Sequence, residues 1–157
     1  MQSTLDDFKS TLDQAEAQLG KITDLDSRQV RSPGKWSRKQ VLGHLIDSAA
    51  NNHQRFVRAQ LGQELLVFPG YEQEGWVSVQ RYQDENWATL VALWRYYNRH
   101  LLHVMTQVPN DRLSRRCVIG ASDPVTLEFL MKDYVAHLKH HLKQILEKLP
   151  VASAGDV

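Results

Sequence analysis

The sequence contains one cysteine, Cys117, among its 157 residues. A single cysteine cannot form an intramolecular disulfide, and it cannot build a zinc site made of several thiolates. Any metal site in this chain must therefore use histidine nitrogens and oxygen ligands. We interpret Cys117 itself as a structural residue, because no pattern typical of a nucleophile surrounds it.

Long apolar runs and a strong excess of one charge are also missing. No stretch approaches the roughly 18 consecutive apolar residues of a membrane-spanning helix. Residues 1–8 carry two aspartates and do not resemble a signal peptide. The 19 basic and 18 acidic residues leave a formal net charge of +1, which gives no broad field for attracting nucleic acid or an anionic membrane. We expect a cytoplasmic protein with neither of these partners.

Composition favours an ordinary folded domain. Hydrophobic residues make up 42% of the chain and charged residues 24%, both close to the averages for globular proteins. A chain of this length can bury about two-thirds of the surface that its unfolded form exposes. We expect a single domain over residues 1–150, followed by a flexible C-terminal tail over 151–157.

Four segments have the apolar periodicity of amphipathic helices, with apolar residues every three or four positions. The first three span residues 3–19, 37–61 and 85–107, and the fourth starts at Thr126 or Asp123 and reaches residue 149. Ser37 and Gln40 have the spacing of a capping box, which places the start of the second segment. Because no strong strand alternation accompanies these patterns, the sequence predicts an all-α four-helix bundle.

The connections differ in character. Residues 21–35 form a long connection that can contain a short turn of helix. Residues 62–84 are expected to be a long loop between the second and third helices, and their aromatic side chains favour a packed covering that could roof a pocket. Between the third and fourth helices, residues 117–119 can form an extended segment. Trp87 and Trp94 look exposed on the third helix, which makes a homodimer a reasonable expectation.

The fourth helical segment contains the strongest chemical signal. His137 and His141 are four residues apart, so their side chains lie on the same helical face and could chelate one ion. His140 falls closer to the charged residues of the segment. A rotation of the helix by one residue would instead pair His137 with His140, and this alternative stays open. Further histidines, His53, His100 and His103, are read as surface or packing residues.

A third imidazole and several polar groups lie on the second helix. His44 is on its half-buried face, where polar side chains need an explanation. Arg55 could hold a substrate carboxylate through two hydrogen bonds, or it could form an ordinary salt bridge. Ser48 and Asn52 could orient a ligand or a water, or they could bond only to neighbouring backbone. Ser48, Asn52 and Arg55 are therefore the catalytic candidates.

Two blocks of the sequence resemble a known family. The run Trp36–Ser48, continuing to Asn52 and Arg55, resembles the first conserved block of the DinB-like (YfiT-like) superfamily, and the stretch His137–Ile145 resembles the second. The resemblance implies an up-down-down-up four-helix bundle. It also implies one divalent metal ion, nickel or zinc in many members, held by three histidines, which are His44, His137 and His141 in this chain.

The resemblance defines a class of reaction. The family includes metal-dependent hydrolases and thiol S-transferases that use low-molecular-weight thiols, so we expect a metal site that activates water or such a thiol. No glutamate follows the first histidine of the fourth helix in the His-Glu-x-x-His manner, which disfavours metalloprotease chemistry. The alternatives are a non-catalytic metal-binding or stress-related module, and a structural bundle that dimerises.

Overall fold

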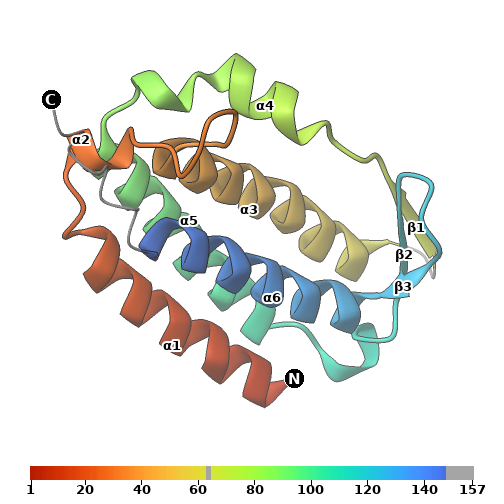
Figure 1. Cartoon of the computed structure of the whole chain (residues 1–157). Coiled ribbons are helices and arrows are strands. Elements are labelled where there is room, and N and C mark those ends of the chain that lie inside the picture. Colours follow the sequence, from red (N-terminus) through yellow and green to blue (C-terminus); the bar gives the residue numbers. More distant parts are fainter. Residues whose placement is uncertain (63–64, 148–157) are drawn as a thin grey trace, which may run out of the picture.

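Four long helices form the body of the protein. The computed structural model describes residues 1–62 and 65–147. The long helices are α1 (Gln2–Leu19), α3 (Arg38–Leu61), α5 (Trp87–Thr106) and α6 (Leu127–Leu146). Figure 1 shows α1 and α6 running in one direction and α3 and α5 in the other. The up-down-down-up bundle expected from the sequence is therefore confirmed.

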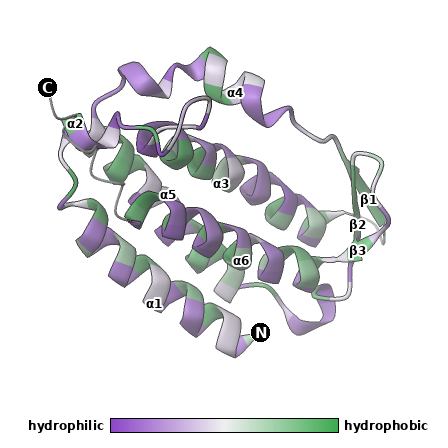
Figure 2. Cartoon of the chain, viewed as in Figure 1, coloured by the Kyte–Doolittle hydropathy of each residue, from purple (hydrophilic) through white to green (hydrophobic). Residues whose placement is uncertain are grey.

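The apolar stripes of the four helices meet in one core. α3 packs against both α5 and α6, and α1 closes the bundle by packing against the same two helices. Figure 2 shows green hydrophobic stripes alternating with purple hydrophilic ones along these helices. The largest apolar side chains without solvent exposure include Trp94, Phe8 and Phe56. Burial of each such side chain stabilises the fold by about 1.5–3 kcal/mol.

Side-chain caps fix where α3 and α6 begin. The Ser37 hydroxyl accepts a hydrogen bond from the Gln40 amide, and the Gln40 side chain accepts one from the Ser37 amide, so the predicted capping box is present. Thr126 caps α6 in a similar way through the amide of Phe129. α6 ends at Leu146, earlier than predicted, because Glu147 is extended. Residues 149 and 150 and the predicted tail, 151–157, lie outside the described residues.

The connections contain more regular structure than the sequence predicted. The 21–35 connection contains the expected helical turn, α2 (Asp24–Ser27), and a 3-10 turn, η2 (Asn110–Arg112), follows α5. The 62–84 connection is not a plain loop, because it contains β1 (Leu65–Phe68), α4 (Gln73–Gln80) and the 3-10 turn η1 (Tyr82–Asp84). β1 pairs in parallel with β2 (Arg116–Ile119), which covers the predicted extended segment, and β2 pairs antiparallel with β3 (Val125–Thr126).

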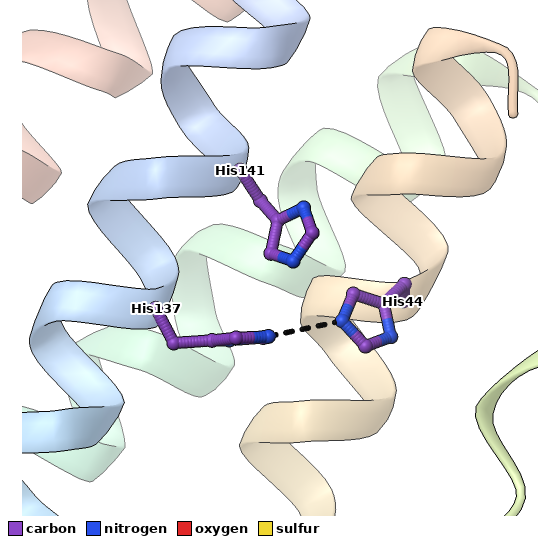
Figure 3. A group of neighbouring side chains, drawn as sticks. All are labelled: His44, His137 and His141. Atoms are coloured by element: carbon purple, nitrogen blue, oxygen red, sulfur yellow. Dashed lines mark hydrogen bonds between the residues drawn. The ribbon is translucent and has the colours of Figure 1, made fainter. Parts of the chain in front are cut away.

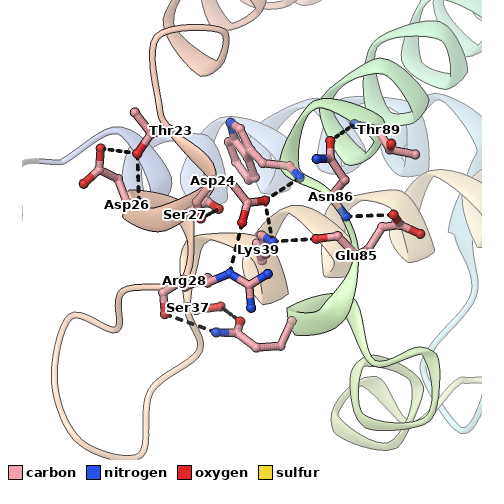
Figure 4. A network of polar contacts seen from close by, with 12 residues as sticks. Thr23, Asp24, Asp26, Ser27, Arg28, Ser37, Lys39, Glu85, Asn86 and Thr89 are labelled. Carbon is pink, nitrogen blue, oxygen red and sulfur yellow. Dashed lines mark hydrogen bonds and ion pairs between the residues drawn. The ribbon is translucent and has the colours of Figure 1, made fainter.

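A buried lysine ties α2 to the starts of α3 and α5 (Figure 4). Lys39 has no solvent exposure, and its Nζ lies 2.7 Å from Oδ1 of Asp24. The same ammonium donates to the carbonyl of Glu85, and Asp24 also accepts a hydrogen bond from the amide of Trp87. The hydrogen bond from Lys39 holds the pKa of Asp24 well below its usual range. This network fixes the chain that leads into α3 and therefore into the His44 region.

The expected exposure of two tryptophans is wrong. Trp87 and Trp94 are 4% and 0% exposed, and the indole nitrogen of Trp87 donates to the carbonyl of Leu19. Both belong to the core in which α5 packs against α1 and α3. Leu93 and Tyr96 are the large hydrophobic residues that are exposed on α5 instead. None of the described helices is both long enough and apolar enough to cross a membrane.

Candidate metal centre

Three histidines from two helices meet between α3 and α6 (Figure 3). His44 comes from α3, and His137 and His141 come from successive turns of α6. Each of them offers one ring nitrogen, and the three nitrogens lie within 4.8 Å of one another. The Nε2 atoms of His44 and His137 are 3.1 Å apart. The structure therefore brings together the three histidines that the sequence singled out.

The neighbouring histidine is not part of this cluster. His140 is exposed and does not belong to the group of converging nitrogens, whereas the ring of His141 lies 4.8 Å from that of His44. The rings of His137 and His141 are 4.5 Å apart, as expected for residues one helical turn apart on the same face. The arrangement that uses His140 in place of His141 is therefore not the one in the structure.

The geometry of the cluster fits a divalent ion. Two nitrogen ligands of a tetrahedral zinc ion would lie about 3.3 Å apart for typical zinc–nitrogen bonds. The observed separation of the His44 and His137 Nε2 atoms, 3.1 Å, is close to that value. The Nδ1 atoms of both rings are buried and have no hydrogen-bond partner among the described residues. Within residues 1–62 and 65–147, no carboxylate forms an ion pair with these rings, and their facing Nε2 atoms are placed to share a cation.

Burial keeps the cluster uncharged. Burial, with a smaller contribution from the neighbouring imidazoles, lowers the pKa of His44 and of His137 to about 4. Burial also lowers the pKa of His141. The three imidazoles are therefore neutral near pH 7, which is the form that binds metal ions.

Gln144 fixes the tautomer of His141. Its Oε1 lies 3.0 Å from Nδ1 of His141, and its Nε2 lies 2.9 Å from Nε2 of His140. An amide oxygen only accepts, so Nδ1 of His141 is the donor and Nε2 of that ring keeps its lone pair for the cluster. Sequence reasoning missed this role. The spacing could have revealed it, since Gln144 is three residues after His141 on the same helix.

The polar residues that follow His44 form their own network. Ser48 and Asn52 are buried, and the Asn52 amide donates to the Ser48 carbonyl at 2.9 Å. Arg55 is half-buried and donates to Asn52 Oδ1 at 3.3 Å. Among the described residues, no carboxylate forms an ion pair with Arg55. The predicted catalytic candidates thus line one side of α3 beyond His44, with Arg55 at the end of the series.

A cavity of about 810 Å³ adjoins the histidine cluster. It lies between the 31–38 segment and the last turns of α6, and its lining includes Trp36 and Gln144. The ring of Trp36 is 5.2 Å from that of His44, and Gln144 contacts His141 as described above. The walls of the cavity are therefore in direct contact with two of the three histidines.

Other residues with reactive side chains lie outside the cluster. His53, from α3, contacts Tyr97 and His100 of α5. Cys117 is fully buried, and burial raises the pKa of its thiol, which agrees with the structural role predicted for it. An unreactive thiol of this kind would not serve as a nucleophile near neutral pH.

Comparison with other sequences gives three similarities. The family model described as the DinB superfamily matches residues 7–145. A candidate metal-dependent hydrolase of Bacillus mycoides (strain KBAB4) is 28% identical over 127 residues, which cover 79% of this chain and 72% of that protein. A second candidate metal-dependent hydrolase, from Oceanobacillus iheyensis, is 22% identical over 149 residues, which cover 90% and 85% respectively.

Solved structures share the fold. YfiT from Bacillus subtilis, described as a candidate metal-dependent hydrolase with an unusual four-helix bundle topology, has a TM-score of 0.77 and 23% identity, over 90% of this chain and 83% of that one. A mycothiol-dependent maleylpyruvate isomerase has a TM-score of 0.74 and 12% identity, over 96% of this chain and 61% of that one. At these identities the similarity shows a common fold.

Proposed function

The chain belongs to the DinB superfamily, and from this premise we propose that it is a metal-dependent enzyme whose His44, His137 and His141 hold one divalent ion. Nickel and zinc are the ions we expect, since both accept imidazole ligands. The observation that carries this proposal is the convergence of three neutral imidazoles, with two Nε2 atoms 3.1 Å apart. The two hydrolase-like relatives support it.

The reaction we propose is hydrolysis or transfer of a low-molecular-weight thiol. Three protein ligands leave a coordination position open. A divalent ion, when bound, lowers the pKa of a water or a thiol and polarises a substrate oxygen. The sequence relatives described as metal-dependent hydrolases support hydrolysis. The fold shared with a mycothiol-dependent isomerase supports a thiol co-substrate.

The residues of the chain have distinct tasks in this proposal. His44 has no solvent exposure, so its ring is held away from bulk water. Gln144 keeps His141 in the tautomer that presents Nε2. Arg55 orients an anionic part of the substrate, since it has four remaining donor hydrogens after its bond to Asn52. Ser48 and Asn52, which lie next to each other on α3, are the other two candidates for contact with the substrate.

Elemental analysis tests the metal site. Protein purified without a histidine tag should contain about one nickel or zinc per chain, and His137→Ala and His141→Ala should each lose it. His103→Ala is the matched control, because His103 is exposed on α5 and should leave the metal content unchanged. His140→Ala should also keep the metal. A wild-type chain that stays metal-free after reconstitution with either ion would reject the proposal.

Activity measurements then separate the reactions. Metal-loaded protein would be tested for ester hydrolysis and for thiol transfer, each before and after removal of the metal by a chelator. Turnover that disappears with the metal and returns with it supports the enzyme. Metal binding without turnover of either substrate class would favour the non-catalytic metal-binding module.

A further inference from the structure

We propose that the cavity beside the histidine cluster binds a carboxylate-bearing small molecule with an apolar body, recognised by Lys35 and Arg38 and packed against Trp36. The inference deepens the proposed function, because such a molecule is the substrate only if the adjacent cluster is the reactive centre. The binding itself does not depend on a metal ion. It can therefore be measured separately.

The size and position of the cavity suit a small molecule. Its volume, about 810 Å³, lies within the range of roughly 300–1,000 Å³ typical of ligand pockets. Trp36 and Gln144 line it and also contact His44 and His141. A ligand packed against Trp36 or Gln144 would therefore be separated from the cluster by a single side chain.

The cations that line the cavity outnumber the acids. Arg31, Lys35 and Arg38 line it, and Glu74 is the one acidic residue of that lining. Arg31 is already neutralised by an ion pair with Glu147. Lys35 and Arg38 form no ion pair with any carboxylate in the described part of the chain, and they are the charges available to a ligand.

The guanidinium of Arg38 has donors without an acceptor. Its Nη2 donates to the carbonyl of Glu147 at 2.9 Å, but its Nε is buried and has no partner among the described residues. The bond to Glu147 leaves further guanidinium donors unused, and a carboxylate is the ligand group that matches a guanidinium best. Lys35 is exposed beside it and can add a second charge.

The remaining walls are apolar. Trp36, Val41 and Ile145 also line the cavity, and Trp36 is half-buried. Packing of an apolar ligand surface against an aromatic wall of this kind stabilises the complex. The combination of a flat apolar wall and an unpaired guanidinium points to an amphipathic acid rather than to a sugar or a free inorganic anion.

Binding of a matched pair of probes tests the proposal. The acid is 2-naphthoate and the neutral partner is 2-naphthylmethanol, which have the same ring system. Calorimetry on metal-free full-length protein should show that naphthoate binds roughly ten- to a hundredfold more tightly than the alcohol, as expected for hydrogen bonds to a charged group. Lys35→Gln/Arg38→Gln should remove this preference, and Lys35→Gln alone should reduce it. Binding should also quench tryptophan fluorescence, and Trp36→Phe should abolish most of the quenching.

The control variant has the same net charge as Lys35→Gln/Arg38→Gln. Lys9→Gln/Lys21→Gln removes two exposed lysines that do not line the cavity and should preserve the preference. Circular dichroism must show that each variant is folded. If the double variant Lys35→Gln/Arg38→Gln does not fold, Lys35→Gln alone decides the matter. Equal affinity for both probes in the wild type, or a preference that survives in the cavity variants, would overturn the inference. A wild-type chain that binds no metal would reject the proposed function, but it would not affect the measurement of probe binding.

Discussion

A β-carbon on Gly43 would lie 2.0 Å from the ring of Tyr82, so this ring lies directly on the backbone of α3. Gly43 precedes His44 in the sequence. The Tyr82 hydroxyl also donates to Oδ1 of Asp47 at 2.7 Å, one turn further along the helix. Together, the close approach and the hydrogen bond hold the segment after α4 against the part of α3 that carries the histidine.

Gly43→Ala should destabilise the protein. Alanine favours helices over glycine by about 1 kcal/mol, but its methyl group would overlap the Tyr82 ring. We expect the clash to prevail, with a net loss of about 1–3 kcal/mol in the free energy of unfolding. Gly20→Ala is the control, because Gly20 has a helical conformation and its nearest neighbour, the Glu16 carbonyl, is 3.5 Å from the added carbon. Urea unfolding of both variants would settle this, and an unchanged or higher stability of Gly43→Ala would contradict the prediction.

The sequence predicted the features that depend on local interactions. The start of α3 follows from the side chains of a capping box three residues apart, and the spacing of His137 and His141 follows from the pitch of one helix. Long-range pairing was not predictable in this way. β1 pairs with β2 from a distant part of the chain, and each strand is only four residues long, too short to show a clear alternation.

The burial of a side chain was predictable only where it follows from the apolar face of its own helix. Trp87 and Trp94 were expected to be exposed on α5, but both belong to the core in which α5 packs against α1 and α3. Lys39 shows the same limitation, since a lysine is rarely buried without a partner and its partner, Asp24, comes from a separate short helix. The rotation of α6 likewise left His140 and His141 unresolved until α3 supplied His44.

Gln144→Leu should weaken metal binding without removing the three histidines. The substitution removes the acceptor that holds Nδ1 of His141 protonated, so the ring can adopt the tautomer that blocks Nε2. We expect the dissociation constant for zinc to rise about 10- to 100-fold, measured by competition with a chromogenic chelator. Gln144→Glu keeps an acceptor and should retain tight binding. Lys143→Gln, an exposed neighbour, should bind zinc as the wild type does. Equal zinc affinity in Gln144→Leu and the wild type would show that the amide does not position the ring.

The metal-free protein should lose stability as the pH falls below neutrality. The folded state lowers the pKa of His44 and His137 to about 4, whereas an unfolded histidine titrates near 6.5. Between these values the unfolded chain binds more protons than the folded one, so the free energy of unfolding decreases as the pH falls from about 6.5 toward 4. The decrease should be about 3 kcal/mol for one such histidine, and the two contributions need not add because the rings face each other. Above pH 6.5 both states are neutral and the full stability is retained.

Comparison with a variant isolates the two histidines from the other groups that titrate in acid. His44→Leu/His137→Leu should show a much flatter stability profile between pH 6.5 and 4, while His103→Ala should follow the wild type. Carboxylates with lowered pKa, such as Asp24, contribute only as the pH falls below the ordinary range of an acid, so their effect lies under this window. Urea unfolding at a series of pH values would measure the slopes. The same slope in the double leucine variant and the wild type would mean that these imidazoles take up protons as readily in the folded state as in the unfolded chain, so that burial does not lower their pKa.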